Sequence, residues 1–408
     1  MWNTESLVIR HQIKCPVHGF IPLTKLATSV VNHPYMQRLR HIKQLGLAYM
    51  TFPSANHTRF EHSLGTYYMA GLMVDKVKAT GQKFVIPGLF SIPSELTPEI
   101  MECVKLAALC HDLGHGPYSH VLDQLFFGSD PHPMADHEVR SISLATEIFS
   151  SILPSEYAKF TVSLIHPTDE CIKLAESTHS QALYQIVSNY KNGIDVDKFD
   201  YLARDTRSVG FGLDFSYQRL LNSLQISETG DITYHRKCDT DVYDLFYSRY
   251  LMHKKVYSHR KSKKIEAMVL DLLQMMDPVL GFTSSLNDMS RFTTFTDSTL
   301  FEVTRLVGPP EARALLHRID SCQFYDIVLE SRDRTEVEDQ VGQWIVAYGS
   351  VPFKVVTITC SFAADYSNIR FHNADTECIV SPDLPTITIE SYLVICRDPV
   401  ISAEIKIE

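Results

Sequence analysis

An apolar stretch that ends in the dipeptide His-Asp is the sequence feature that most limits which folds this chain can adopt. Residues 107–120 read AALCHDLGHGPYSH, so a helix with a buried face runs into His111 and Asp112 before glycines break it. At a helix end, neighbouring side chains can reach one cation, through an imidazole nitrogen and a carboxylate oxygen. His115 lies one turn beyond His111 on the same helical face. The pattern predicts a metal ion held at the end of a helix.

The composition is that of a globular protein. Of 408 residues, 45% are hydrophobic and 21% are charged, which argues against a disordered, collagen-like or repeat chain. No apolar run approaches the roughly 18 residues of a membrane span, and the first residues, MWNTESLVIRHQ, do not resemble a signal peptide. Nine cysteines without a CxxC motif indicate reduced thiols, so we expect a cytoplasmic or nuclear protein. A net charge of −10 disfavours general nucleic-acid binding but is compatible with a local basic pocket.

Helical periodicity dominates most of the chain. A helix followed by a turn is expected over residues 24–50, with Gly46 ending the run, and loops are expected at 82–98 and 128–136. Further helices are predicted at 62–80, 99–112, 137–152, 155–165, 181–191, 195–204, 216–224, 240–257 and 263–276. The predicted fold class is therefore mainly α.

Two stretches near the C-terminus alternate between apolar and polar residues. Residues 353–362 place Val356, Ile358 and Cys360 on one face, and residues 386–396 behave similarly, so both are predicted as strands. We predict one domain over residues 1–290, a helical body that extends to about residue 330, and a small C-terminal α+β lobe within 291–408.

A second segment with candidate functional residues is 56–63, which reads NHTRFEHS. It offers His62 as a candidate metal ligand and Arg59 as a candidate anion binder, because the guanidinium fork suits phosphate. A surface salt bridge is the alternative role for Arg59.

A third segment, residues 193–205, reads GIDVDKFDYLARD. Asp197, Tyr201 and Asp205 recur every four residues and share one helical face, with Lys198 beside it. These groups suit a cation together with a polyanion. An ordinary solvated acidic helix is the alternative.

A fourth segment, residues 249–264, carries seven Lys or Arg residues and no acid. Such a local positive field attracts phosphates. Arg249, His253 and Tyr257 recur every four residues on one face. A basic surface helix or a targeting run is the alternative.

These segments follow one another in the order H…HD…D, and in that order the chain resembles the HD-domain metal phosphohydrolases. The segments RLRHIKQLG, NHTRFEHSLGT, LCHDLGHGPYSH and NGIDVDKFDYLARD, with the Arg249/His253/Tyr257 face, strongly resemble the dNTP triphosphohydrolases that in animals carry a sterile alpha motif ahead of the HD domain. The resemblance implies an HD-domain helical bundle for residues 1–290. A sterile alpha motif is expected to be absent, because the HD body begins near residue 10.

The resemblance implies one divalent metal per subunit. Its ligands would be His62, His111, Asp112 and Asp197. Two imidazoles and two carboxylates suit Mn, Fe, Zn or Mg, and a further Mg ion would accompany the triphosphate.

The resemblance also implies the groups around the substrate. The residues close to the α-phosphate and the attacking water would be His115, His120 and His137, of which we favour His115, acting with a neighbouring carboxylate, as the proton donor. The residues that grip the triphosphate would be Arg59, Lys198, Tyr201 and Arg249. The sugar would meet Gln44 and Tyr257, and the pocket would include Asp205 and His253. Tyr257 against the deoxyribose would leave no room for a 2′-hydroxyl. The implied reaction converts dNTP and water to deoxynucleoside and inorganic triphosphate.

The family also has a regulatory site where GTP or dNTPs assemble a tetramer. We assign Gln37, Arg40 and Arg260 to such a site here. The chain departs from the family pattern at Cys15, Asn32 and Cys322. Asn in place of an acid adds a donor to a group that otherwise only accepts, so guanine selectivity is in question. We expect a homo-oligomer, dimer or tetramer, that is constitutively active or activated by a nucleotide other than GTP.

Two alternative functions stay open at this point. One is an HD phosphohydrolase that acts on another nucleotide, such as a nucleoside monophosphate or a ribonucleotide. The other is a protein without turnover that binds nucleotides, or single-stranded nucleic acid through residues 249–264. We assign no function to His57, His132 and His166, and a surface or capping role is favoured for His57.

Overall fold

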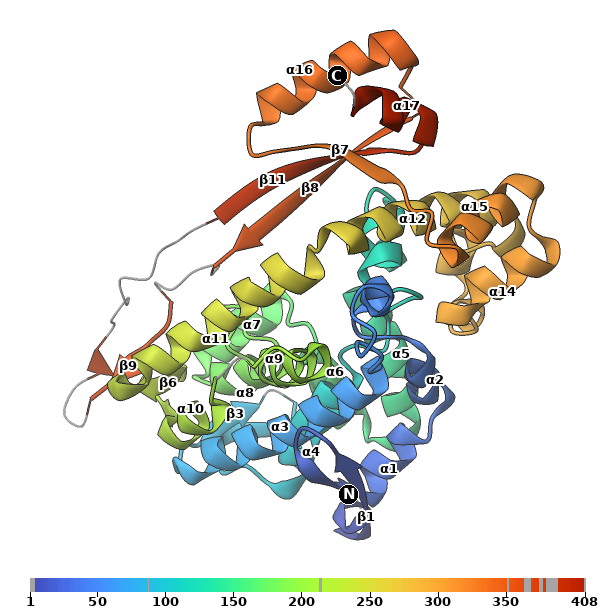
Figure 1. Ribbon diagram of the computed structural model, residues 1–408. Coiled ribbons are helices and arrows are strands. Elements are labelled where there is room, and N and C mark those ends of the chain that lie inside the picture. Colours follow the sequence, from blue (N-terminus) through green and yellow to red (C-terminus); the bar gives the residue numbers. More distant parts are fainter. Residues whose placement is uncertain are drawn as a thin grey trace.

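The computed structural model describes residues 4–86, 88–212, 215–350, 352–362, 368–373, 377–378 and 388–406. Figure 1 shows a helical body with a smaller lobe, formed by the C-terminal part of the chain, standing at one end of it. The mainly α fold class is confirmed. Among the described residues, every helix is too short or too polar to cross a membrane.

The body consists of helices joined by short turns. Its α-helices are α1 (Lys25–Val31), α2 (Pro34–Arg38), α3 (Arg59–Ala79), α4 (Pro98–Cys110), α5 (His137–Ile152), α6 (Ser155–Ser163), α7 (Asp169–Ser177), α8 (Gln181–Val187), α9 (Val196–Val209), α10 (Tyr217–Ser223), α11 (Asp239–Met252), α12 (Arg260–Leu280), α13 (Met289–Phe292), α14 (Asp297–Val307) and α15 (Pro310–Asp320). The shorter helical turns are η1 (Thr4–Leu7), η2 (Leu39–His41), η3 (Gly46–Met50), η4 (Val121–Phe126), η5 (Pro133–Ala135), η6 (Arg236–Cys238), η7 (His253–Tyr257) and η8 (Ser284–Asn287).

Helix α3 lies at the centre of the body and packs against α4, α8 and α9. Its apolar side chains are buried on more than one side, as expected of a helix surrounded by others. The remaining predicted helices are found within a few residues of their expected limits, and α5 matches its expected limits, 137–152. Through these contacts α3 brings the ends of α4 and α9 to the same place.

The prediction of one helix followed by a turn over residues 24–50 is wrong in part. The chain forms α1, α2, η2 and η3 instead, with a break at His33. His33 is extended at ψ 140 because it precedes Pro34, whose ring disfavours helical backbone in the preceding residue. Gly46 does not end a helix but begins η3 with φ +49, and a Cβ there would lie 2.7 Å from the carbonyl oxygen of Tyr118.

The loop expected over residues 82–98 is also wrong in part. It contains an antiparallel hairpin of β3 (Phe84–Ile86) and β4 (Phe90–Ser94). A second hairpin, β1 (Ile9–Cys15) with β2 (Gly19–Thr24), covers the N-terminal side of the body. Both pairs are short, so the period-two alternation extends over too few residues to be recognised.

The lobe is built on a three-stranded antiparallel sheet in the order β7-β11-β8, with bounds Asp326–Ser331, Thr388–Cys396 and Phe353–Ser361. Both predicted C-terminal strands are therefore present, although residues 386–387 lie outside the described residues. The helices of the lobe are α16 (Arg334–Tyr348) and α17 (Pro399–Ile405). The remaining strands, β10 (Glu377–Cys378), β9 (Phe371–His372), β6 (Ile232–His235) and β5 (Gln225–Ile226), form a small sheet against the body.

The lobe is joined to the body by apolar and ionic contacts. Ile395 of β11 belongs to the same apolar cluster as the buried face of α12, and Arg397 Nη2 lies 2.8 Å from Asp271 Oδ1. Helical packing continues through α14 and α15, which both contact α12. The domain division at residue 290 stays a prediction.

Candidate active site

The four predicted metal ligands converge from three helices. His62 lies in the first turn of α3, His111 caps α4 with Asp112 directly after it, and Asp197 lies in the first turn of α9. His62 Nε2 lies 3.0 Å from Asp197 Oδ1, 3.3 Å from His111 Nε2 and 3.6 Å from Asp112 Oδ2. His111 Nε2 lies 3.4 Å from Asp112 Oδ1 and 3.5 Å from Asp197 Oδ1.

These separations fit a first coordination shell. A tetrahedral ion with bonds of about 2.1 Å separates its donor atoms by about 3.4 Å, and an octahedral ion by about 3.0 Å. His111 Nδ1 donates to the carbonyl of Ala108 at 2.8 Å, so its Nε2 presents a lone pair to the site. Two imidazole nitrogens and two carboxylates at these distances form a set that could hold a divalent cation.

The electrostatics of the ligand set favour positive charge at this place. Burial lowers the pKa of His62, but hydrogen bonds with Asp197 and Asp200 outweigh it and raise this pKa to about 10. A proton can therefore stand in for the cation on the metal-free protein. Metal binding would displace that proton.

Asp200 binds the Nδ1 side of the His62 ring, while Nε2 faces the other predicted ligands. The sequence analysis missed this role of Asp200. Its Oδ2 accepts from His62 Nδ1 at 2.8 Å, and its Oδ1 lies 2.5 Å from His18 Nε2. Arg204, one helical turn further along α9, donates to both oxygens. A Cβ at position 65 of α3 would overlap the Asp200 carboxylate, which explains the glycine there. The four-residue spacing of Asp200 and Arg204 is the sequence signal that could have revealed the pair.

His115 forms a dyad with a carboxylate that the sequence analysis did not identify, Asp123. His115 Nδ1 lies 2.6 Å from Asp123 Oδ2, and the buried Arg140 donates to the other oxygen. Burial raises the pKa of Asp123, but the contacts from His115 and Arg140 hold it well below its usual range. The ionised Asp123 fixes Nδ1–H of His115 and leaves its Nε2 3.4 Å from Asp112 Oδ1.

His120 and His137 flank this dyad. The His137 ring stacks on His115 with 4.0 Å between centroids, and the His120 ring meets His115 edge-on at 5.5 Å. Burial and the neighbouring His115 lower the pKa of both to about 3. His120 and His137 are therefore neutral near pH 7 and suited to hydrogen bonding.

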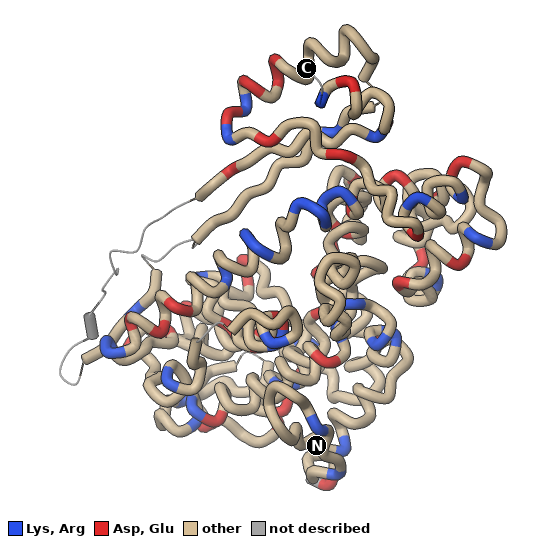
Figure 2. The backbone as a smooth tube through the Cα atoms, viewed as in Figure 1, with Lys and Arg blue, Asp and Glu red and all other residues tan. Residues whose placement is uncertain are grey.

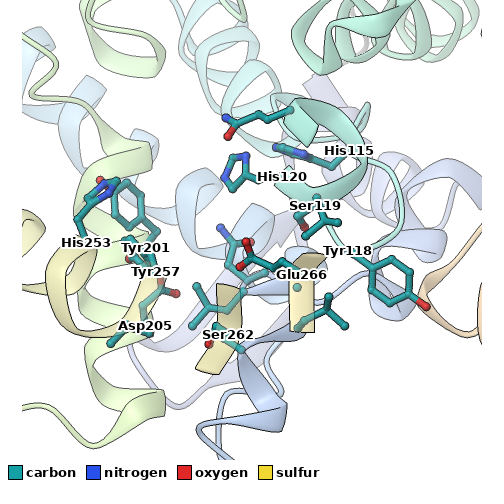
Figure 3. Close-up of a pocket in the computed structure, with 18 of the residues that line it drawn as sticks. His115, Tyr118, Ser119, His120, Tyr201, Asp205, His253, Tyr257, Ser262 and Glu266 are labelled. Carbon is teal, nitrogen blue, oxygen red and sulfur yellow. The ribbon is translucent and has the colours of Figure 1, made fainter. Parts of the chain in front are cut away.

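A cavity of about 490 Å³ opens beside the ligand set (Figure 3). Its lining includes two of the metal ligands, Asp112 and Asp197, while His62 and His111 lie beneath it. Every residue predicted to act on the substrate also lines it: Gln44, Arg59, His115, His120, His137, Lys198, Tyr201, Asp205, Arg249, His253 and Tyr257.

Cationic groups gather on one part of the cavity wall. Arg59 Nη1 lies 2.5 Å from Asp112 Oδ2 and its Nε donates to Ser119 Oγ at 2.9 Å. Arg249 Nη1 donates to the carbonyl of Ser361 at 3.2 Å, a contact from the lobe. Figure 2 shows basic residues along α12, which continues the same run. A salt bridge does form at Arg59, but it is buried and belongs to the site.

Asp205 connects two sides of the cavity. Its Oδ1 lies 2.7 Å from His57 Nε2, and its Oδ2 accepts from the Tyr257 hydroxyl at 2.7 Å. His57 is buried, so the expectation of a surface role for it is wrong. The sequence gives no spacing between residues 57 and 205 that would join them. Burial raises the pKa of Tyr257 further above 10, so its hydroxyl donates at all ordinary pH values.

The residues assigned to regulation do not form one cluster of contacts in the described part of the chain. Arg40 Nε donates to Gln37 Oε1 at 2.8 Å, and Gln37 Nε2 donates to the carbonyl of Val31, beside Asn32. Arg260 instead forms an exposed ion pair with Glu330 of the lobe at 2.8 Å.

The three positions that depart from the family pattern and the two other histidines also have defined places. Asn32 caps α1, Cys322 is exposed, and buried Cys15 lies 3.6 Å from Arg204 Nη2. His132 accepts from the Met134 N–H and His166 pairs with Glu138, so neither enters the site.

Comparison with known proteins identifies the scaffold. Residues 59–205, which contain all four ligands, match the HD domain. This part of the chain is therefore an HD domain. The chain is 42% identical over 296 residues to an HD domain-containing protein of Acanthamoeba polyphaga mimivirus, covering 71% of this chain and 63% of that protein.

This HD-domain chain also closely resembles the deoxynucleoside triphosphate triphosphohydrolases named SAMHD1. It is 33% identical over 356 residues to that of Gallus gallus, covering 78% of this chain and 56% of the relative. It is 32% identical over 362 residues to that of Homo sapiens, covering 80% and 56%. The chain thus spans between about half and two thirds of the length of the relatives it matches.

Proposed function

We propose that this protein is a metal-dependent dNTP triphosphohydrolase that lowers dNTP pools. The observation that carries the proposal is the cavity, whose lining includes Asp112 and Asp197 of the predicted ligand set together with Lys198, Tyr201, Arg249 and Tyr257. A ligand set at one side of a cationic wall suits a polyphosphate, and a tyrosine held by a carboxylate suits a sugar. The similarity to named dNTP triphosphohydrolases supports this substrate class.

In this proposal the chain positions the triphosphate through its cationic wall. Arg59 and Lys198 neutralise phosphate oxygens, and Arg249 extends the positive wall along the polyphosphate. Lys198 keeps its charge despite burial, because Asp195 raises its pKa. Burial raises the pKa of Tyr201 to about 12, so its hydroxyl is a donor to phosphate. A divalent ion in the His/Asp set supplies Lewis-acid polarisation of the α-phosphoryl group and a more acidic water.

His115 is the group that we assign to proton donation. Water adds to the α-phosphorus, the bond from phosphorus to the 5′-oxygen breaks, and that oxygen takes up the Nε2 proton of a doubly protonated His115. The proton that the attacking water releases restores this imidazolium. Asp123 holds the imidazole in the orientation for this transfer. The products are a deoxynucleoside and intact inorganic triphosphate. Atoms balance with one water consumed.

Selection of a deoxy sugar is assigned to Tyr257. The hydrogen bond to Asp205 and the edge-on contact with His253, 5.0 Å between centroids, fix the plane of its ring. A ring fixed against the 2′ carbon excludes a 2′-hydroxyl because the two groups would overlap. Loss of a hydrogen bond is not needed for this selection.

Regulation and assembly belong to the proposal as well. We propose a dimer or tetramer that is either constitutively active or activated by a nucleotide other than GTP near Gln37 and Arg40, with Asn32 in the position that reads the base. A dNTP-consuming enzyme acts on a cytoplasmic or nuclear pool, so we propose that location. Binding to single-stranded nucleic acid would be secondary to turnover.

The test is a product assay on the whole chain with dGTP and either Mg²⁺ or Mn²⁺, with and without GTP. Separation by ion exchange should yield deoxyguanosine and triphosphate. Release of dGMP or phosphate would favour another phosphohydrolase activity. Binding of dGTP without any product would favour a nucleotide-binding protein.

A further inference from the structure

One wall of the cavity is not used by the reaction proposed above. It consists of residues 45–48, part of η4, and the α12 face that carries Ser262 and Glu266. Helix α12 packs against η3 and η4, and Ser262 Oγ donates to Thr51 Oγ1 at 3.1 Å. Figure 3 shows Ser262 and Glu266 side by side on this wall.

Apolar side chains of the segments that pack near α12 also line the cavity. They are Leu45, Leu47, Val121 and Leu125. A planar base bound between such side chains buries its two faces and leaves its edge for polar recognition. The α12 face supplies the polar groups.

Lys263 and Glu266 form an ion pair inside this wall. Lys263 Nζ lies 2.8 Å from Glu266 Oε2, and the two side chains are 21% and 16% exposed. Among the residues that the structure describes, the Glu266 carboxylate has no polar partner except Lys263. A half-buried pair that lines a cavity offers a ligand one strong donor beside a carboxylate that only accepts.

We propose that Lys263 and Glu266 read the base of the substrate and select guanine. This inference rests on the proposed function. The guanine edge presents the O6 acceptor next to the N1–H and N2–H donors, so Lys263 can donate to O6 while Glu266 accepts from both N–H groups. Thymine offers only one donor and places its O2 acceptor against the carboxylate. Adenine and cytosine each offer one amino group and no N–H beside it.

The experiment compares kcat/KM for dGTP, dATP, dCTP, dTTP and deoxyinosine triphosphate on the whole chain. Deoxyinosine triphosphate keeps O6 and N1–H but lacks the 2-amino group. The expected order is dGTP first, deoxyinosine triphosphate second, and the other three lower than dGTP by roughly tenfold to a hundredfold. Equal values for the four natural substrates would overturn the inference and leave the proposed function intact.

Variants separate base reading from stability. Glu266→Gln should reduce the ratio of dGTP to dATP by roughly tenfold or more, because the amide donor faces the guanine donors. Lys263→Met should reduce the ratio of dGTP to dCTP. Glu156→Gln removes a matched but exposed Lys159–Glu156 pair on α6 and should leave both ratios unchanged. An equal fall for all substrates in Glu266→Gln would contradict base reading.

If no nucleotide is hydrolysed, a binding measurement still tests whether the site selects guanine. Equilibrium dialysis with Mg²⁺ and each of the four dNTPs should then still show dGTP bound more tightly than dTTP. Absence of turnover with this preference would remove the proposed function and retain base selection. Absence of turnover without the preference would remove both.

Discussion

Asp297 accepts a hydrogen bond from the backbone N–H of Tyr118 at 2.8 Å. Its other carboxylate oxygen accepts from the N–H of Lys43, also at 2.8 Å. Tyr118 and the next residue, Ser119, have φ values of +60 and +53, which non-glycine residues rarely adopt. Ser119 Oγ in turn accepts from Arg59. One carboxylate at the start of α14 therefore holds the strained loop that positions Arg59, the arginine proposed to bind phosphate.

Replacing Asp297 should destabilise the fold. Asp297→Ala leaves two partly buried N–H groups without their acceptor. Each costs about 1–3 kcal/mol, so we expect a loss of roughly 2–6 kcal/mol. Urea unfolding measures this loss. Glu302→Ala, an exposed position on the same helix, is the control and should change stability by less than about 0.5 kcal/mol. Equal effects of the two variants would contradict the role of Asp297.

Asp297 should also make stability depend on pH. Burial raises its pKa to about 6, against the opposing effects of Lys43 and Arg38. Since an unfolded Asp titrates near ~3.9, the native state binds more protons between about pH 4 and 6. This contribution to the free energy of unfolding is present below about pH 4 and is lost as pH rises to about 6. The wild-type minus Asp297→Asn difference, measured by urea unfolding from pH 4.5 to 7, should fall by roughly 2 kcal/mol. A difference that rises with pH would contradict it.

Removal of the metal ligands should abolish turnover and metal binding together. His111→Ala takes away one imidazole from the set, so we expect at least a roughly thousandfold loss of kcat and a fall in bound metal. Elemental analysis and thermal unfolding with and without a chelator check both effects. His166→Ala, an exposed histidine paired with Glu138, should change neither. Full metal content in His111→Ala would show that the ligand assignment is wrong.

The His115–Asp123 dyad should affect proton transfer without affecting the metal. Asp123→Asn removes the charge that fixes Nδ1–H of His115, so kcat should fall by roughly 10²–10⁴-fold while metal content stays at the wild-type level. Arg140 loses its ion-pair partner, so some stability is lost as well. Unchanged kcat would indicate that another group donates the proton.

Tyr257 should control the choice between deoxyribose and ribose. Tyr257→Ala opens space at the 2′ carbon and should raise the kcat/KM ratio of GTP to dGTP by roughly tenfold. Tyr257→Phe keeps the ring and loses only the hydrogen bond to Asp205, so the ratio should stay low. A raised ratio in the phenylalanine variant would assign the selection to the Asp205 contact instead.

Local patterns in the sequence account for much of the fold and of the site. Helices such as α5 are long and strongly periodic, so their limits could be predicted closely. His111 and Asp112 are adjacent in the chain, and Asp197, Tyr201 and Asp205 share a helix face, so these sets could be recognised from spacing alone.

Contacts between distant segments could not be predicted in this way. His57 meets Asp205 across 148 residues and His18 meets Asp200 across 182 residues, and no local period encodes such pairs. The helix break at Pro34 could not be predicted with certainty, because a single proline interrupts an otherwise helical pattern. The hairpins could not be predicted because their alternation extends over only a few residues.

Oxygen-18 water tests the central claim most directly. Turnover of dGTP by the metal-loaded chain in labelled water should place one labelled oxygen in the inorganic triphosphate and none in deoxyguanosine, because water adds to the α-phosphorus and the 5′-oxygen leaves. Mass spectrometry of the two products decides this. Label in deoxyguanosine, or label in released phosphate or pyrophosphate, would contradict triphosphohydrolase chemistry at this site.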